Sequence, residues 1–303
     1  MSVAAPRIMT QTDARRVALA YLELAKPSIV LLVLLTGVPA LLMATPGMPS
    51  ASAFFGVIAG IAMAAASAAS FNHYFDRDID ALMRRTARRP LPSGTLPPSS
   101  ALGMGFVLAG LAWVTLLTFG NLLAGLIGMA SITYYALFYT VWLKRRTPQN
   151  IVIGGGAGAS APLIAWAAMT GTVALPAVLL AAIVFFWTPP HFWALSLYRR
   201  DDYARAGIPM LPVTHGEAET RRQILLYTIG LVPLTLLIVP FGIAGWIYGV
   251  PAVLLGAGFI GLAARLARAP STPNAVAVFR YSILFLFALY LSMAVDAIAA
   301  RLF

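Results

Sequence analysis

The sequence contains no cysteine, and only 10% of its 303 residues are charged. The absence of cysteine excludes disulfides, thiolate metal sites and cysteine nucleophiles. Soluble globular proteins carry roughly 25% charged residues, whereas 60% of this chain is hydrophobic. The apolar runs are continuous and lack the alternation over about ten residues that marks a membrane β-barrel. The composition therefore predicts an all-α, polytopic protein of the lipid bilayer.

Nine segments are apolar and close to the length of about 20 residues that a helix needs to cross a membrane. They are residues 29–44, 51–71, 101–119, 122–143, 151–169, 175–197, 224–241, 246–266 and 281–300. We expect nine transmembrane helices in one integral-membrane domain, residues 1–303, with residues 1–26 as a cytoplasmic N-terminal arm.

Lysine and arginine are missing from every second connection, namely "TPGMPS", "FGN", "TGTVA" and "GIAG". The opposite side carries 20 of the 21 basic residues. By the positive-inside rule, the N-terminus is cytoplasmic and the C-terminus lies outside the cell's inner membrane. Because topology explains the basic residues, the net charge of +11 does not indicate a nucleic acid partner.

The stretch "FNHYFDRDIDALMRR" places polar residues at the cytoplasmic end of the second span. Asn72, Asp76 and Asp80 are four residues apart, so each step turns about 40° and rises about 6 Å along a helix. These three side chains share one stripe, while Asp78 points to the other side. Oxygen ligands on one face suit Mg²⁺, which binds one or two carboxylates together with phosphate oxygens and water.

Basic residues near this stripe can hold an anion, since guanidinium groups match phosphate geometry. The candidates on this side are Arg77, Arg84 and Arg89, with Lys144 after the fourth span and Arg199 and Arg200 after the sixth. Metal, carboxylates and cations together predict a pyrophosphate site. The alternative is a salt-bridged helix cap in which the basic residues only fix the topology.

A second polar region begins inside the sixth span. Pro189 and Pro190 are expected to break or kink that helix. If the helix resumes, His191, Tyr198 and Asp202 share a stripe, and the eleven residues from His191 to Asp202 cover about 16 Å. His191 then lies near the bilayer centre, where an ionisable residue indicates function. The alternative is a hydrogen-bonded packing histidine.

These motifs resemble the UbiA superfamily of intramembrane prenyltransferases, over nearly the whole chain. Asn72, Asp76 and Asp80 match the first aspartate motif of that superfamily. The second motif departs from the usual D-x-x-x-D, because Tyr198 stands four residues before Asp202. That departure resembles the haem-farnesylating branch, whose pattern is matched by Pro190, His191, Ala194, Asp202, Tyr203, Ala206, Ile208, Pro209, Met210, Leu211, Pro212 and Val213.

The resemblance implies transfer of a farnesyl group from farnesyl pyrophosphate to a vinyl of haem b, with addition of water. It implies that Asn72, Asp76, Asp80 and Asp202 bind Mg²⁺ and the pyrophosphate. His191 and His73 are then candidates to hold the haem, and haem A synthase or a terminal oxidase assembly factor is a candidate partner. The alternatives are a quinone-precursor prenyltransferase of the same superfamily and, in another class, a membrane transporter.

Overall fold

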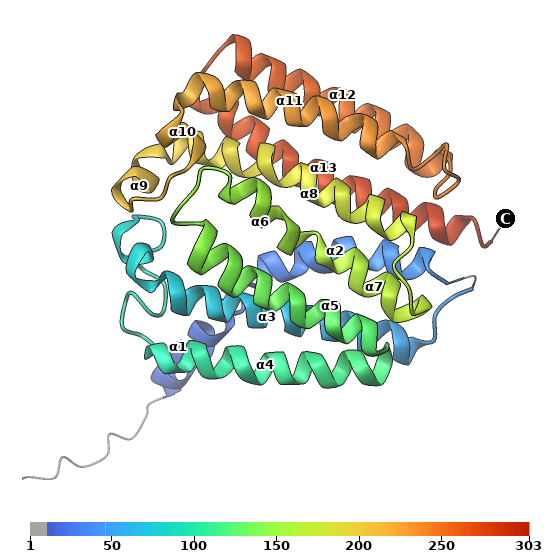
Figure 1. Ribbon diagram of the computed structural model, residues 1–303, viewed down its shortest axis with the longest axis horizontal. Coiled ribbons are helices and arrows are strands. Elements are labelled where there is room, and N and C mark those ends of the chain that lie inside the picture. The colour runs from blue at the N-terminus through green and yellow to red at the C-terminus, as the bar shows by residue number, and fades with distance from the viewer. Residues whose placement is uncertain (1–10, 46, 303) are drawn as a thin grey trace, which may run out of the picture.

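The computed structural model describes residues 11–45 and 47–302, which form helices and turns without a β-strand (Figure 1). The helices are α1 (Gln11–Leu24), α2 (Pro27–Met43), α3 (Ala51–Leu82), α4 (Pro98–Phe119), α5 (Leu122–Thr133), the π-helix η1 (Tyr134–Leu143), α6 (Asn150–Gly158), α7 (Ser160–Thr170), α8 (Leu175–Tyr198), α9 (Arg200–Arg205), α10 (Leu211–Thr214), α11 (Gly216–Leu236), α12 (Trp246–Arg268) and α13 (Thr272–Ala299). The predicted all-α fold is confirmed.

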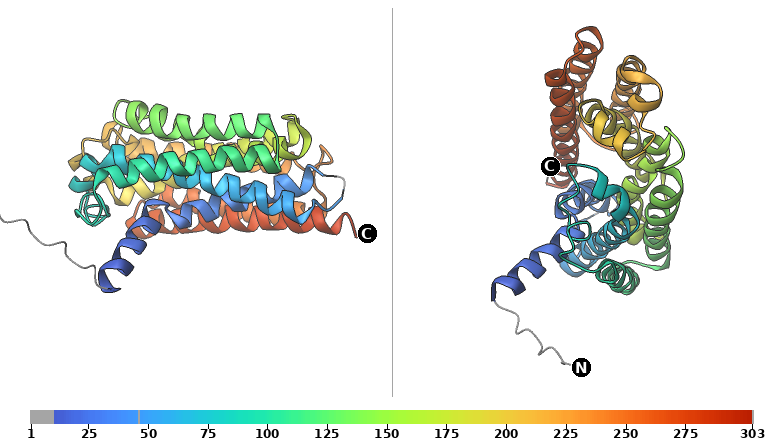
Figure 2. Two further views of the ribbon diagram at one scale, coloured as in Figure 1. Left: turned by 90° about the horizontal axis from the view of Figure 1, so that it is seen from below. Right: turned by 90° about the vertical axis from the view of Figure 1, so that its left-hand side faces the viewer.

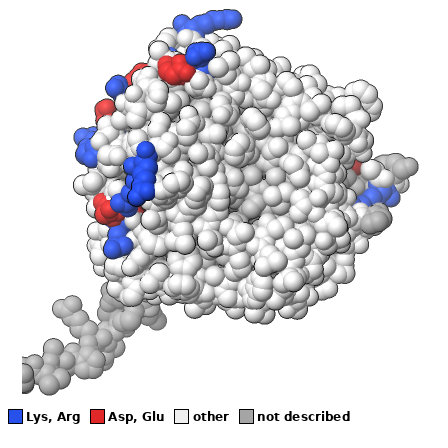
Figure 3. All heavy atoms as spheres, in the orientation of Figure 1, with Lys and Arg blue, Asp and Glu red and all other residues white. Residues whose placement is uncertain are grey.

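The long helices lie side by side in one bundle, while α1 projects from it (Figure 2). The axes of α1 and α2 differ by 42°. Charged side chains gather along the end of the bundle that carries α9 and α10, at the left of Figure 3. The wide, uncharged middle of the visible face fits a surface that contacts lipid.

Seven helices of the described residues are long and apolar enough to cross a membrane, or eight if α1 and α2 count as one bent span. The protein is therefore a multi-pass membrane protein, but the expected count of nine is not confirmed. The expected span that is missing from this count is residues 224–241. The corresponding helix, α11, begins at Gly216, eight residues earlier than expected. Its first two turns carry Glu217, Glu219, Arg221 and Arg222.

Helix α8 runs unbroken through Pro189 and Pro190, so of the expected break or kink the break is wrong, and the kink stays a prediction. The Thr188 hydroxyl donates to the Val184 carbonyl at 2.8 Å, and α11 and α13 pack along the helix. Hydroxyl groups and neighbouring helices are the features that allow proline inside membrane helices.

Helix α8 instead ends at Tyr198, where Arg199 leaves helical geometry with φ −115° and ψ 16°. Asp202 belongs to the separate short helix α9, so its predicted place on one stripe with His191 is wrong. His191 lies seven residues before the end of α8, a rise of about 10 Å.

Glycines allow close helix contacts at several levels of the bundle. A Cβ added at Gly154 of α6 would lie 2.3 Å from the Tyr139 ring of η1, and one at Gly60 of α3 would lie 2.7 Å from Leu116 of α4. Small residues permit such contacts between membrane helices. Gly154 therefore lets η1 pack closely against α6.

Candidate active site

The last three turns of α3 carry the predicted polar stripe. Asn72, Asp76 and Asp80 are 3%, 1% and 2% exposed, and the Asn72 amide donates to Asp76 Oδ2 at 2.7 Å. Asp78 lies on the other side, with a 60% exposed side chain that pairs with Arg145. The four-residue spacing thus correctly separated the buried carboxylates from the exposed one.

Each buried carboxylate meets a basic side chain from a different segment. Lys144 Nζ lies 2.5 Å from Asp76 Oδ2, and Arg89 donates to Asp80 Oδ2 at 2.7 Å. Lys144 and Arg89 were among the residues predicted from sequence, and the structure brings both to the stripe. Breaking such a buried pair is costly because the remaining carboxylate loses its counter-charge.

Lys26 is a further residue of this site that the sequence pattern did not indicate. Its Nζ donates to Asn72 Oδ1 at 2.5 Å. Burial, followed by repulsion from Arg89, lowers the pKa of Lys26 to about 7. The residue before a proline is expected to be extended, so nothing in the sequence indicated the left-handed backbone of Lys26 or its contact to Asn72.

The backbone of Lys26 has φ 50° and ψ 64°, the left-handed conformation. Among non-glycine residues of the described chain, it alone has a positive φ. This conformation costs an L-residue roughly 1–2 kcal/mol. Lys26 joins α1 to α2 at their bend, and its side-chain ammonium group contacts Asn72 of α3. We name Lys26, Asn72, Asp76, Asp80, Arg89 and Lys144 the α3 charge cluster.

The π-helix η1 contributes Lys144 and a second contact to the cluster. Thr140 accepts from the Asn72 amide at 3.0 Å and donates to the Tyr135 carbonyl at 2.8 Å. Lys144 follows the last residue of η1, and its backbone N–H donates to the Tyr139 carbonyl at 2.8 Å. π-Helical turns occur frequently at functional sites, and this one sets the direction of Lys144.

The loop 83–97 covers the end of α3. Thr86 donates its hydroxyl to the Asp80 carbonyl at 2.9 Å, and Leu91 and Leu96 are buried against Leu24 of α1. The loop is therefore anchored both to α3 and to α1, and from it Arg89 reaches Asp80.

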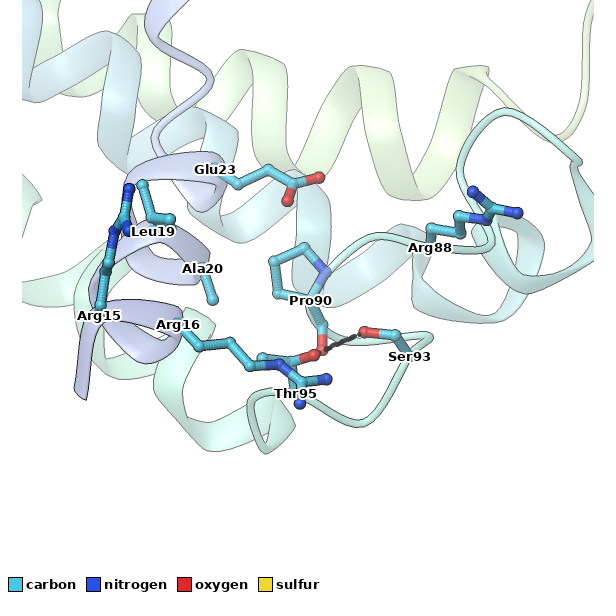
Figure 4. Close-up of a pocket in the computed structure, with 9 residues that line it drawn as sticks. All are labelled: Arg15, Arg16, Leu19, Ala20, Glu23, Arg88, Pro90, Ser93 and Thr95. Atoms are coloured by element: carbon cyan, nitrogen blue, oxygen red, sulfur yellow. Dashed lines mark hydrogen bonds between the residues drawn. The ribbon is translucent and has the colours of Figure 1, made fainter. Parts of the chain in front are cut away.

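A cleft of about 510 Å³ lies between α1 and this loop (Figure 4). Arg16 lies beside Thr95, whereas Arg88 extends on the opposite side of the view. The cleft is linked to the α3 charge cluster in sequence, because Arg88, which lines the cleft, directly precedes Arg89 of the cluster. Its guanidinium groups do not converge on one point.

The remaining predicted residues have contacts of their own. Arg77 lies 4.6 Å from the Tyr74 ring centre and Arg199 5.6 Å from that of Tyr198. Arg200 pairs with Glu217 at 3.5 Å, and Arg84 is exposed. Asp202 is buried and pairs with Arg205 at 3.4 Å. No hydrogen bond or ion pair within residues 11–45 and 47–302 joins these groups to Asp76 or Asp80.

The cluster offers oxygen ligands for a cation. Asp76 Oδ1 is buried and has no hydrogen-bond partner, which leaves one carboxylate oxygen available. The described residues contain no group of three or more Asp, Glu or His side chains placed to hold a metal. Two neighbouring carboxylates fit Mg²⁺ with phosphate oxygens and water as further ligands, rather than a cation enclosed by protein.

The two predicted histidines lie in different surroundings. His73 is 1% exposed on α3, and neither ring nitrogen has a hydrogen-bond partner. His191 is 8% exposed on α8, and its Nδ1 lies 2.7 Å from Ser282 Oγ of α13. A buried imidazole without a partner is costly, so the surroundings of His73 are consistent with an added ligand.

Comparison with known proteins identifies the class. Residues 31–290 match the UbiA prenyltransferase family, and the chain belongs to this family. At 22% identity, the structure of a digeranylgeranylglyceryl phosphate synthase has the same fold, with a TM-score of 0.77 over 93% of this chain and 99% of that chain. A UbiA homolog from Archaeoglobus fulgidus, bound to DMAPP and Mg²⁺, is 17% identical, with a TM-score of 0.59 over 91% and 99%.

The curated relatives are more specific. A protoheme IX farnesyltransferase from Azorhizobium caulinodans is 49% identical over 282 residues, 92% of each chain. One from Roseiflexus sp. (strain RS-1) is 47% identical over 278 residues, 92% of this chain. The alignment covers only 52% of that longer relative, so this chain spans about half its length.

Proposed function

We propose that this protein transfers a farnesyl group from farnesyl pyrophosphate to a vinyl of haem b, with addition of water, and releases pyrophosphate. The product is haem O. The α3 charge cluster carries the proposal, since buried carboxylates and cations occupy the end of an apolar helix in a UbiA family member. The names of relatives at 47–49% identity support haem as the acceptor.

Asp76 and Asp80, with Asn72 beside them, are proposed to hold Mg²⁺, and Asp202 is a further candidate from the sequence motif. When bound, the ion neutralises charge that develops on the departing pyrophosphate. Lys144 and Arg89 already lie at the two carboxylates and can turn to phosphate oxygens. They then stabilise the leaving group electrostatically. Lys26 supplies a third cation at the same place.

Arg77, Arg84, Arg199 and Arg200 remain weaker candidates for the pyrophosphate. Their guanidinium groups contact aromatic rings or an exposed glutamate, or are exposed. They would have to leave these contacts to reach a ligand at Asp76. The inner cations Lys26, Arg89 and Lys144 are therefore the better assignment.

For the haem substrate we propose His191 as the residue that binds the iron, with His73 as the second candidate. Imidazole is a common haem ligand. His191 lies among aromatic rings on α8 and α13, whereas His73 lies close enough to Lys26 and Arg89 to interact with both charges. Because of these cationic surroundings, His73 is better placed to contact the pyrophosphate than to bind the haem iron.

We also propose that the charge-rich end of the bundle faces the cytoplasm of a cell with the protein in its inner membrane. Twenty of the 21 basic residues belong to the arm and connections assigned to that side. Haem A synthase or a terminal oxidase assembly factor remains a proposed partner, since the proposed product would have to pass from this membrane protein to a protein that uses it.

The rival functions predict different substrates. A quinone-precursor prenyltransferase would use the same α3 charge cluster with another acceptor. A transporter would be favoured by a broken helix at the substrate site, and the unbroken α8 gives it no such support. The acceptor is therefore the point that an assay must decide.

The test is an assay of the purified protein in detergent with haem b, farnesyl pyrophosphate and Mg²⁺, with products identified by mass. Asp76→Asn is expected to lower kcat/KM by about 100-fold or more, the size of losing one active-site electrostatic contact. Asp78→Asn is the matched control, because Asp78 is exposed on the same helix. Prenylation of a quinone precursor but not of haem would refute the proposal.

A further inference from the structure

His191 is held between two aromatic rings. The Trp187 ring centre lies 4.3 Å from that of His191 with an interplanar angle of 19°, and Phe279 lies 4.7 Å away at 25°. Both rings are stacked on the imidazole. Trp187 precedes His191 by one turn of α8, while Phe279 belongs to α13. The stack restricts rotation of the imidazole and fixes the directions of its two nitrogens.

The hydrogen bonds of Ser282 determine which nitrogen carries the proton. Ser282 Oγ donates to the Phe279 carbonyl at 2.6 Å, and a serine hydroxyl has one hydrogen to donate. His191 Nδ1 lies 2.7 Å from the same Oγ. Since that hydrogen is already used, Oγ accepts, and Nδ1–H donates.

A second contact holds Ser282 in this position. Trp187 Nε1 donates to the Ser282 carbonyl at 2.7 Å, and this bond is buried. The backbone and the side chain of Ser282 are thus both bound by residues of α8 that lie one turn apart. The contact sets the register of α13 against α8 at His191.

We infer that Ser282 is a positioning residue, which holds neutral His191 as the Nδ1–H tautomer and leaves the lone pair of Nε2 available for a metal ligand bond. The identity of the metal as the haem iron rests on the proposed function. Histidine ligands commonly donate their other ring N–H to a neighbouring acceptor, and this fixes the ring orientation and raises the basicity of the bound nitrogen.

The tautomer can be tested without haem. In protein labelled with ¹⁵N-histidine, we expect the His191 resonances to show a protonated Nδ1 and an unprotonated Nε2, assigned by their loss in His191→Ala. Ser282→Ala should shift the population toward the other tautomer. Ser292→Ala is the matched control, because Ser292 makes the same type of bond to Leu289 on α13. Protonated Nε2 in the unchanged protein, or no change in Ser282→Ala, would refute the inference.

Haem titration tests the iron bond separately. His191→Ala should abolish the histidine-ligated absorption spectrum, and Ser282→Ala should weaken haem binding about 10-fold to 100-fold, as for other outer partners of metal ligands. Ser282→Thr keeps the hydroxyl and should restore binding. An unchanged spectrum in His191→Ala would refute haem ligation in the proposed function, and the tautomer result would still decide the role of Ser282.

Discussion

Replacing Lys144 by glutamine removes the counter-charge of the most deeply buried carboxylate. The side chain of Asp76 is 1% exposed and that of Lys144 16%. Removing one partner of a buried ion pair typically costs about 3–5 kcal/mol. Because the Asn72 amide still donates to the same Oδ2, we expect the lower end, about 3 kcal/mol.

The measurement is the unfolding free energy in mild detergent titrated with SDS, in the presence of EDTA. Mg²⁺ should then stabilise Lys144→Gln more than the unchanged protein, because a bound cation replaces the missing ammonium and binding favours the folded state. Arg145→Gln is the control from the next residue. Its partner Asp78 is exposed, so the loss should stay below about 1 kcal/mol.

Equal stability of Lys144→Gln and the unchanged protein in EDTA would refute the reasoning. It would mean that water or another group satisfies Asp76, and that the short contact to Lys144 contributes no net stability. A loss of similar size in Arg145→Gln would also refute it, since burial would then not decide the value of the pair.

Two further predictions concern the backbone around the cluster. Lys26→Gly should be more stable than Lys26→Ala by about 1 kcal/mol, because glycine adopts the left-handed conformation without the steric cost. Both variants should lose activity and Lys26→Arg should keep most of it. Equal stability of the first two in SDS titration would contradict the strain at φ 50°. Gly154→Ala should cost about 1–3 kcal/mol through overpacking against Tyr139 and lower activity by shifting η1. A Cβ added at Gly110 would have no atom within 4 Å, so Gly110→Ala should not destabilise the protein. Equal stability of the Gly154→Ala and Gly110→Ala variants would contradict the close contact at Gly154.

The polar stripe was predictable because it depends on local geometry. A four-residue spacing in a helix places Asn72, Asp76 and Asp80 together whatever the rest of the chain does. The same argument correctly excluded Asp78. Lys26 was not predicted as a site residue, because its contact to Asn72 joins residues 46 positions apart. Such contacts depend on how α2 packs against α3, and a single sequence does not contain that packing.

The sixth span shows where a local rule fails. Two adjacent prolines remove two backbone donors and predict a break, yet α8 continues through them, packed against α11 and α13. The true end comes eight residues after Pro190, at Tyr198. His191 and Asp202 would share a stripe only if the helix continued through Arg199, and α8 ends before that residue. The assignment of His191 itself does not depend on that alignment.

The charges of the α3 cluster distinguish a binding site from a helix cap. A cap that only shields buried carboxylates needs one cation for each, and Arg89 and Lys144 already provide them. Lys26 adds a third basic group, whose pKa is lowered by burial and then by repulsion from Arg89, and it lies on a strained backbone. Both features cost free energy in the absence of a ligand. A bound anion would offset the repulsion, so strain at Lys26 is the kind that functional sites retain. The excess positive charge therefore favours a pyrophosphate site over a structural cap.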